Sequence, residues 1–353
     1  MIPLFKPYMA PEAGRLVQEV LYSGQLAEGP KVKIFEKDLC DYLDLPNAVA
    51  TNSGTAAITL ACRLAGVTQG SYVVSTPMTC TATNTAIAAA GGHILWADVL
   101  DDGNMDPFDL DEVLDLNPGV TAVVCVHWAG RPAALSALRE VCKKYGVKLI
   151  EDAAHAFGAH YEDVYIGNKT ADYTCFSFQA IKHLTCGDGG ALVCKDSGDV
   201  SRAKRLRWFG LERDIDRDKL QDPDEWGWKF HMNDIAATIG IANLREMNTI
   251  LSLHRHHVRY LDSVLGNDMD SQPLWVYPLR VPNRAQFMKA MWGHGIATSV
   301  VHARNDKLRH LPAPPRDLPG VDAFDSTQVN VPCGWWLSSE DITYIGETIR
   351  RLT

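Results

Sequence analysis

The segment FSFQAIKHLTCGDGGALV, residues 176–193, places Lys182 between two apolar runs. An amine held in apolar surroundings has a lowered pKa, and this makes its nitrogen a better nucleophile. The glycines at 187, 189 and 190 let the backbone come close to a bound group. Lys182 is therefore a candidate for a lysine that forms a Schiff base with a carbonyl cofactor, although a surface lysine beside a turn would have the same local sequence.

Short apolar runs alternate with helix-like segments from about residue 48 to residue 195. Runs of this length, bounded by turn residues, are typical of buried strands. The strand candidates are AVAT (48–51), SYVVSTP (71–77), HILWADV (93–99), TAVVCVHW (121–128), VKLIEDA (147–153), DYTCFSF (172–178) and GGALVCK (189–195). Helices between successive strands indicate crossover connections, so the sequence predicts an α/β fold with a central, mainly parallel sheet and helices on both faces.

The sequence pattern changes after about residue 200. The charged stretch 212–226 predicts a long surface loop, and residues 233–265 predict helix. The elements expected beyond Pro273 are a strand (274–281), a helix (284–295), an extended proline-rich loop (309–320) and a final helix capped by Ser338 (338–352). We therefore divide the chain into a large domain with an N-terminal helical segment, residues 1–240, and a smaller C-terminal α+β domain, residues 241–353.

Composition limits the partners that the chain can have. The 353 residues carry a net charge of -9, so neither nucleic acid nor an anionic membrane is an expected partner. The nine cysteines include no CxxC pair and lie partly in apolar runs, which indicates reduced thiols and neither a disulfide framework nor a metal site. The N-terminus MIPLFKPYMAPEAG has no long apolar core, so we expect no signal peptide and a cytoplasmic location.

Two further polar groups follow predicted strands. Ser53, Gly54 and Thr55 begin a helix, where exposed backbone N–H groups and two hydroxyls suit a phosphate, although a plain helix cap explains the same residues. Asp152 ends the run that begins with VKLI, and a partly buried carboxylate there needs a cationic partner. A protonated pyridine nitrogen is such a partner, with an ion pair or a helix cap as the alternative. Because sites in open α/β sheets form at the carboxyl ends of strands, we expect these groups at one edge.

The order of these groups is more specific than any one of them. An SGT motif, then a strand-end aspartate, then a lysine before a glycine-rich turn is the layout of fold-type I pyridoxal phosphate enzymes. The sequence resembles the DegT/StrS family of nucleotide-sugar aminotransferases along nearly its whole length. The segments that carry the resemblance are, in chain order, SGQLAEGPKVKIFEKDLCDYL, TNSGTAAITLA, PMT, VHWAGRP, LIEDAAHAFGA, FSFQAIKHLTCGDGGALV and HMNDIAATIG.

The resemblance implies a cofactor, pyridoxal 5'-phosphate, and roles for the residues that match. Lys182 would bond the cofactor and carry the proton during amino transfer. Asp152 would pair with the ring nitrogen, so that the ring withdraws electrons from the substrate, and His155 would contact the ring hydroxyl. The residues implied to hold the cofactor phosphate are Ser53, Gly54, Thr55 and Ser177.

Several positions depart from the family pattern. Cys80 stands where the family often has an aromatic residue that stacks on the cofactor ring, so the ring packing must differ. In the segment GWKFHM, Lys229 and His231 replace an asparagine and an arginine. The asparagine reaches the cofactor phosphate of the partner subunit, and Lys229 either does the same with a full charge or points to solvent. His183 is a candidate for contact with the substrate or for a structural role.

The C-terminal part offers further candidates for contact with the substrate. His302 and Arg304 lie in VVHARNDK, and a pyrophosphate favours guanidinium donors. Trp335 and Trp336 either flank a base or sugar or pack between domains. None of these roles requires a metal, and we expect no metal site.

The resemblance implies amino transfer, because a dehydratase branch of the family has histidine at the position where this chain keeps Lys182. We expect a homodimer with shared active sites. The expected reaction moves an amino group from glutamate or a similar donor, through pyridoxamine 5'-phosphate, to a 4-keto-6-deoxy sugar on a nucleoside diphosphate, for surface polysaccharide or glycan biosynthesis. The alternatives are an aminotransferase for a cyclic ketone or an antibiotic precursor, and a non-catalytic regulator that binds the cofactor.

Overall fold

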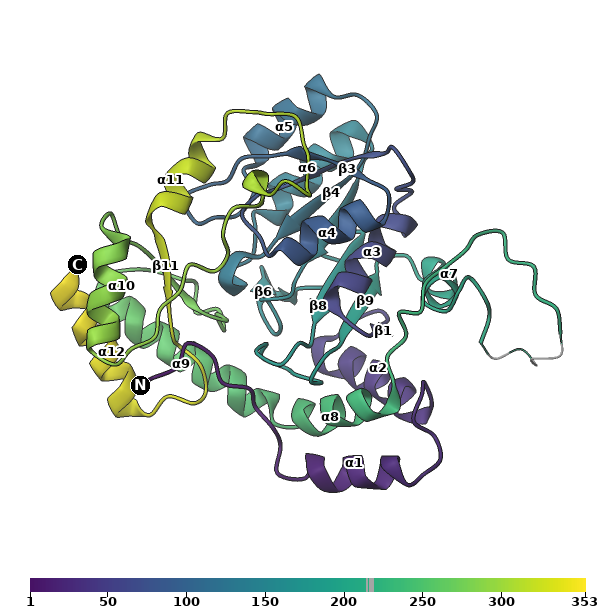
Figure 1. The fold of residues 1–353 in the computed structure, drawn as a ribbon, viewed down its shortest axis with the longest axis horizontal. Helices are drawn as coiled ribbons and strands as arrows, with labels where there is room; N and C mark the ends of the chain where they lie inside the picture. The colour runs from purple at the N-terminus through teal and green to yellow at the C-terminus, as the bar shows by residue number, and fades with distance from the viewer. Residues whose placement is uncertain (214, 216–218) are drawn as a thin grey trace.

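A seven-stranded sheet forms the centre of the structure (Figure 1). The computed structural model describes residues 1–213, 215 and 219–353. In the order β1-β9-β8-β5-β4-β2-β3, the strands are Val49–Thr51 (β1), Gly190–Cys194 (β9), Tyr173–Ser177 (β8), Lys148–Asp152 (β5), Val120–Val126 (β4), Tyr72–Ser75 (β2) and His93–Trp96 (β3). The strands from β8 to β3 are parallel, and β9 is antiparallel to both β8 and β1. The predicted α/β fold with a mainly parallel sheet is therefore confirmed.

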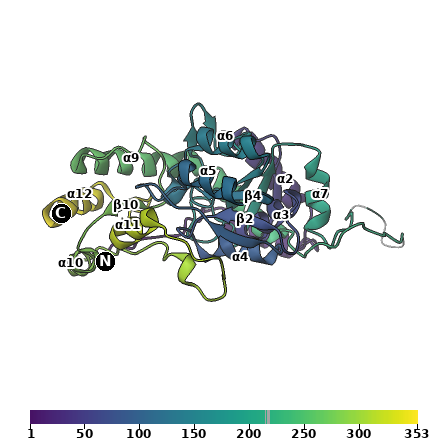
Figure 2. The ribbon, with the colours of Figure 1, turned by 90° about the horizontal axis from the view of Figure 1, so that it is seen from above.

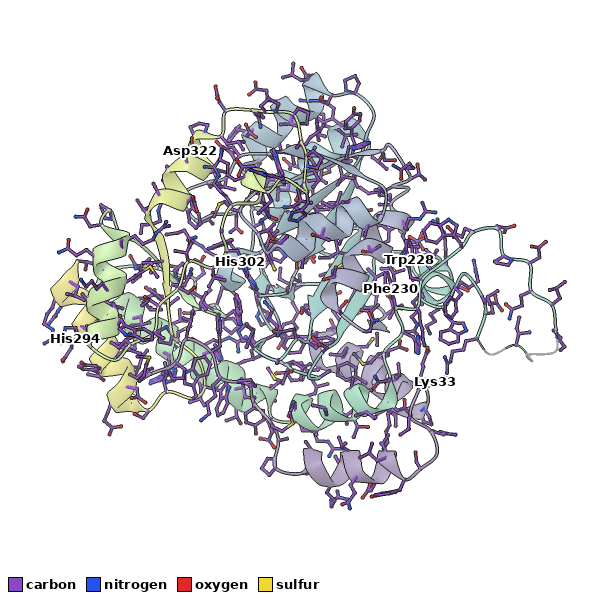
Figure 3. The ribbon with its side chains drawn as sticks, viewed as in Figure 1. Lys33, Trp228, Phe230, His294, His302 and Asp322 are labelled. Atoms are coloured by element: carbon purple, nitrogen blue, oxygen red, sulfur yellow. The ribbon has the colours of Figure 1, made fainter. Side chains whose placement is uncertain are left out.

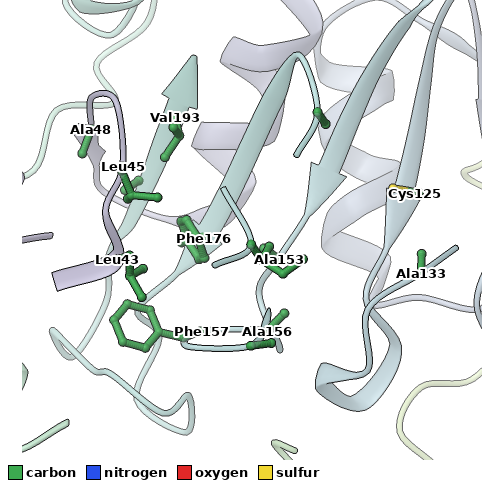
Figure 4. Close-up of a cluster of buried hydrophobic side chains, with 14 of the residues drawn as sticks. Leu43, Leu45, Ala48, Cys125, Ala133, Ala153, Ala156, Phe157, Phe176 and Val193 are labelled. Carbon is green, nitrogen blue, oxygen red and sulfur yellow. The ribbon is translucent and has the colours of Figure 1, made fainter. Parts of the chain in front are cut away.

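Helices cover both faces of this sheet (Figure 2). The core on one face contains residues of α2 (Pro30–Leu43), α5 (Pro107–Leu116), α6 (Leu135–Tyr145) and α8 (Asp234–Leu244). The core on the other face contains residues of α3 (Gly54–Leu64), α4 (Thr81–Ala89) and α7 (Asp199–Leu206). Strand β4 supplies both cores, because successive side chains of a strand point to opposite faces: Val123 belongs to the first and Val124 to the second. Figure 4 shows part of the first core, around Phe157 and Phe176.

A smaller antiparallel sheet lies toward the C-terminus and pairs β10 (Tyr277–Arg280) with β11 (Gln328–Val331). It shares a separate hydrophobic cluster with α10 (Arg284–Gly293), α12 (Ser339–Leu352) and the second half of α9 (Met247–Leu265). The first half of α9 packs in the core of the large sheet, so one helix belongs to both parts. The remaining elements of the described residues are α1 (Ala13–Leu21), the hairpin β6 (His160–Tyr161) and β7 (Val164–Tyr165), α11 (Pro319–Thr327), and two short 3-10 helices, Trp128–Gly130 and Asn305–Lys307. The division at residue 240 stays a prediction.

The structure corrects the sequence-based elements in a few places. The predicted helix 233–265 is two helices, α8 and α9, because the chain turns at Arg245 and Glu246. The extended loop predicted at 309–320 ends early, since α11 begins at Pro319, and proline is tolerated in the first turn of a helix. Strand β11, helix α7 and the β6–β7 hairpin were not predicted. None of the helices in the described residues is long and apolar enough to cross a membrane.

The predicted surface loop 212–226 lies within the connection between α7, which ends at Leu206, and α8, which begins at Asp234. Residues 214 and 216–218 of this segment lie outside the described residues. Its described parts extend away from the large sheet beside α7 (Figure 1).

The final helix begins with a capping box at Ser338. The hydroxyl of Ser338 accepts a hydrogen bond from the N–H of Asp341 at 3.1 Å, and the Asp341 carboxylate accepts one from the N–H of Ser338 at 3.0 Å. We expect Ser338→Ala to lower the free energy of unfolding by about 1 kcal/mol, because a helix N–H group loses its acceptor. Chemical denaturation measures the change, with Ser339→Ala as the matched control. Equal stability of the two variants would contradict the prediction.

Candidate active site

The predicted site residues gather at one edge of the large sheet. Asp152 ends β5 and Ser177 ends β8, at the carboxyl ends of neighbouring parallel strands. Lys182 lies in the loop that joins β8 to β9. Gly190, the first residue of β9, pairs with Ser177 on one side and with Thr51 of β1 on the other. Strand β9 therefore brings the SGT segment, which follows β1, to the same edge as the carboxylate and the lysine.

The N-terminus of α3 forms a closely packed cradle. Ser53 caps the helix, with its hydroxyl accepting a backbone hydrogen bond at 3.1 Å, and the partly buried Thr55 lies in the first turn. A Cβ added at Gly54 would lie 2.9 Å from the Cβ of Ser177, and a Cβ added at Gly190 would lie 2.6 Å from the nitrogen of Gly54. Only glycines permit this approach. The first N–H groups of a helix have no acceptor within the helix, so the cradle suits a phosphate beside the hydroxyl of Ser177.

Asp152 is held in one orientation and is only 4% exposed. Its Oδ2 accepts a hydrogen bond from the hydroxyl of Thr83 at 2.6 Å, and its Oδ1 accepts one from the N–H of Ala154 at 3.1 Å. Burial raises the pKa of Asp152, while these two hydrogen bonds and the charge of Lys182 lower it. A buried carboxylate fixed in this way is suited to pair with a protonated ring nitrogen.

The amine of Lys182 lies over an aromatic ring, 3.7 Å from the centre of the Trp275 ring. Burial lowers the pKa of Lys182 to about 8, and the neighbouring Asp152 and Cys80 oppose this shift. Cys80 is partly buried at the N-terminus of α4, so a thiol near the lysine replaces the bulky ring that the family often has there. An amine with a pKa near this value has the chemistry of both a nucleophile and a carrier of protons.

Three rings beside the lysine lie nearly parallel. The ring centres of His155 and Trp275 are 4.0 Å apart, and His302 lies 5.5 Å from His155 and 6.2 Å from Trp275. Figure 3 shows His302 between the large sheet and the C-terminal sheet. Burial lowers the pKa of His155 well below its ordinary value and that of His302 to about 4, so both rings are neutral. The Nδ1 of His155 and the Nε2 of His302 are buried without a hydrogen-bond partner in the described residues, which suits hydroxyl groups of a bound molecule.

Two residues predicted to contact the substrate have neighbours within the protein. His183 is 3% exposed, and its ring centre lies 4.7 Å from that of His254 in α9. Arg304 donates to both oxygens of Asp306, at 2.7 and 2.8 Å, and also to Asp322. A pyrophosphate at Arg304 would therefore compete with two carboxylates. The substrate roles of His183 and Arg304 stay predictions.

Lys229 lies at the rim of the phosphate cradle. Lys229 is exposed, and the rings of its sequence neighbours Trp228 and Phe230 stack with their centres 5.4 Å apart (Figure 3). Its carbonyl oxygen accepts a hydrogen bond from the side chain of Asn52 at 3.3 Å, so its backbone runs beside the residue that precedes the SGT segment. His231 packs against Trp208, with ring centres 4.5 Å apart, and burial lowers its pKa to about 4.

Trp335 and Trp336 pack against the N-terminal segment. Their indole N–H groups donate to the carbonyl oxygens of Lys6 and Pro3, at 3.2 and 3.1 Å. Of the two interpretations drawn from the sequence, these contacts match packing between distant parts of the chain.

The sequence matches the model of the DegT/DnrJ/EryC1/StrS aminotransferase family over residues 7–350. The chain belongs to this family. The match runs through both sheets and includes every residue of the site described above.

Three relatives illustrate the similarity. UDP-4-amino-4,6-dideoxy-N-acetyl-beta-L-altrosamine transaminase from Campylobacter jejuni is 27% identical over 344 residues, which cover 92% of this chain and 90% of that protein. The crystal structure of the sugar aminotransferase CalS13 from Micromonospora echinospora has a TM-score of 0.94 and 36% identity, and the match covers 99% of this chain and 100% of CalS13. Protein Spr1654 from Streptococcus pneumoniae, in its PLP form, has a TM-score of 0.89 and 25% identity, with 99% and 98% covered. The protein is a pyridoxal phosphate-dependent aminotransferase of the DegT family.

The residues of this aminotransferase fit the cofactor. Pyridoxal phosphate carries a phosphate, a basic ring nitrogen, a ring hydroxyl and an aldehyde. The open N-terminus of α3 lies beside Ser177, the buried carboxylate of Asp152 ends β5, and the nitrogen of His155 is unpartnered. Lys182 supplies an amine with a lowered pKa. Each chemical group of the cofactor thus has a matching protein group at the same edge of the sheet.

Proposed function

We propose that this aminotransferase moves an amino group from glutamate, or a similar donor, to a 4-keto-6-deoxy sugar linked to a nucleoside diphosphate. Pyridoxamine 5'-phosphate would be the aminated form of the cofactor, and the reaction would serve surface polysaccharide or glycan biosynthesis in the cytoplasm. The observation that carries the proposal is the convergence of Lys182, Asp152 and the anion cradle at one sheet edge. The names of two relatives, a transaminase for a UDP-linked amino sugar and a sugar aminotransferase, support the class of substrate.

In this proposal, different residues of the chain bind the cofactor, hold its ring nitrogen protonated and transfer the proton. Pyridoxal phosphate, when bound, withdraws electrons from the bonds of the substrate carbon beside it. Asp152 holds the ring nitrogen protonated, and Thr83 and the N–H of Ala154 keep both carboxylate oxygens in place. The Nζ of Lys182 accepts and returns the proton, because its pKa of about 8 permits both near neutral pH. The hydroxyl of Ser177 and the N-terminus of α3 hold the phosphate.

His302 is the proposed contact to the sugar. Its neutral ring offers a buried, unpartnered Nε2 beside His155. The segment that carries it is held in place by Asn305, whose N–H donates to the carbonyl oxygen of Pro77 at 2.9 Å and whose side chain donates to that of Thr79 at 2.8 Å. A polar group held rigidly over the cofactor site can orient a sugar hydroxyl.

Two half-reactions test the substrate. Glutamate is expected to bleach the visible absorbance of the protein with bound cofactor, and a nucleoside diphosphate 4-keto-6-deoxy sugar is expected to restore it. Restoration by a cyclic ketone but by no nucleotide sugar would overturn the sugar assignment. Absence of bleaching with every amino acid tested would indicate a regulator that binds the cofactor.

We also propose that the protein is a homodimer in which Lys229 serves the cofactor phosphate of the partner subunit. Its exposure, and the contact of its backbone with Asn52 beside the SGT segment, support this role. A charge-assisted hydrogen bond from a lysine to a phosphate is about twice as strong as a neutral one, so Lys229→Ala should weaken retention of the cofactor.

Mixed dimers test whether Lys229 crosses to the partner. Lys182→Ala and Lys229→Ala proteins are each expected to be impaired, and in a mixed dimer one site would contain both native lysines. Mixing equal amounts with subunit exchange should restore about a quarter of the wild-type rate, as symmetry of the dimer requires. If Lys229 served its own chain, mixing would restore nothing.

A further inference from the structure

Trp275 connects the C-terminal sheet to the reactive lysine. It is 3% exposed and lies just before β10. Its indole N–H donates to the carbonyl oxygen of Ile181 at 2.7 Å, directly before Lys182, and its backbone N–H donates to that of Ala129 at 2.8 Å. The ring is therefore tied to the lysine loop, and the backbone of Trp275 to the short 3-10 turn Trp128–Gly130 that follows β4.

Three other side chains contact the Trp275 ring. The Nζ of Lys182 lies 3.7 Å from the ring centre, and the imidazole of His155 stacks on the ring at 4.0 Å with an angle of 21°. Phe5, from the N-terminal segment, stacks on the same ring at 4.6 Å, also at 21°. The backbones of Gly130 and His155 also pack closely, since a Cβ added at Gly130 would lie 2.6 Å from the carbonyl oxygen of His155. Segments from three distant parts of the sequence thus fix the ring.

We propose that Trp275 is a positioning residue, which holds the amine of Lys182 against its π face and keeps the imidazole of His155 in register with the cofactor ring. The inference rests on the proposed role of Lys182, but it does not depend on the identity of the sugar. Trp275 acts through these two side chains. It fixes the position from which the Nζ of Lys182 reaches the cofactor and the proton that is transferred. Phe5 and the Ile181 carbonyl oxygen prevent the indole from turning away.

The electrostatic part of this role is a cation–π attraction. An ammonium group over an indole is stabilised relative to the neutral amine, and more strongly so when it is removed from water. The Trp275 ring therefore opposes the burial that lowers the pKa of Lys182. The other titratable groups that act on this amine or respond to its charge are Asp152, Cys80, His155, His183 and His302.

The test measures the amine itself in the full-length protein after removal of the cofactor. Competitive labelling with trace acetic anhydride across a pH series, read by mass spectrometry of the peptide that contains Lys182, gives the pKa of that amine. Trp275→Leu keeps the surroundings apolar but removes the π face, so the pKa is expected to fall by about half a unit to one unit. Trp292→Leu, at an exposed position of α10, is the matched control and should change nothing. An unchanged pKa in Trp275→Leu would overturn the proposal.

A second variant covers the case in which Trp275→Leu does not fold. Trp275→Phe keeps a ring but attracts a cation more weakly, so it is expected to shift the pKa in the same direction by a smaller amount. No shift in this folded variant would overturn the role of Trp275. Borohydride reduction of the protein with bound cofactor separates the two proposals. Cofactor attached to Lys182 with an unchanged pKa overturns the role of Trp275 alone, whereas no cofactor at Lys182 in the native chain overturns the proposed function.

Discussion

Replacement of Lys182 by alanine is expected to reduce the rate of transamination by about 10⁴-fold or more, because one group supplies both the bond to the cofactor and the transfer of the proton. The amine of Lys182, in the loop after β8, is buried over Trp275 and near Asp152. The measurement is the rate of amino transfer from glutamate with saturating cofactor. The same variant should lack the visible absorbance that glutamate bleaches in the native protein.

Two variants control this experiment. Lys195→Ala removes an exposed lysine at the end of β9 and should leave the rate unchanged. Lys182→Arg keeps a positive charge at the site but supplies a group that stays protonated, so it should be as inactive as Lys182→Ala. Near-native activity of either Lys182 variant would show that the lysine is not the reactive group.

Asp152→Asn is the second large effect that we expect. The substitution keeps the size of the side chain and removes the charge that would hold the ring nitrogen protonated. Breaking a buried charge pair costs about 3–5 kcal/mol, and about 1.36 kcal/mol corresponds to a factor of ten in rate. The rate of the glutamate half-reaction should therefore fall roughly 10²- to 10⁴-fold. The cofactor should remain attached to Lys182, so binding and chemistry are separated.

Thr83→Val is the matched comparison for Asp152→Asn. It removes the hydroxyl that donates to Asp152 at 2.6 Å but leaves the carboxylate charge. Because a hydrogen bond to a charged group contributes about 1.5–3 kcal/mol, a smaller loss of rate is expected than in Asp152→Asn. A larger loss in Thr83→Val than in Asp152→Asn would contradict the role of the charge.

The arrangement of the sheet follows from features that are local in the sequence. Short apolar runs bounded by polar residues predict the strands that end at Asp152 and Ser177, and their alternation with helices predicts parallel neighbours. Once the strands are parallel, the groups that follow them must share an edge. The shared edge of Asp152 and Ser177 therefore follows from the sequence pattern, whereas the SGT segment reaches this edge through the antiparallel strand β9.

The other parts of the site depend on contacts between distant segments. Trp275 lies in the apolar stretch LWVYPLRV, whose local pattern indicates only a buried strand. Its place beside Lys182 arises because the segment before β10 is hydrogen-bonded to the carbonyl oxygens of Ile181 and Ala129, far away in the sequence, and no periodicity encodes these contacts. Thr83 is similarly one of several small residues in a helix, and its hydroxyl matters only because Asp152 lies opposite.

The ion pairs of charged residues are also only partly predictable from the sequence. Arg304 has the chemistry that a pyrophosphate prefers, and the sequence-based prediction rested on that chemistry alone. The fold places Asp306 and Asp322 against it. Asp306 lies only two residues from Arg304 in the sequence, whereas Asp322 reaches it from α11, so the second ion pair depends on how the chain folds. The neighbour of His183, the ring of His254, likewise comes from a distant helix, α9.

The most direct test of the account is to locate the cofactor on the chain. The protein with bound pyridoxal phosphate is reduced with borohydride, which makes the bond between the cofactor and a lysine permanent, and is then digested and analysed by mass spectrometry. The account predicts a single modified peptide that contains Lys182, and its loss when glutamate is added before the reduction. Modification of a different lysine, or none at all, would contradict it.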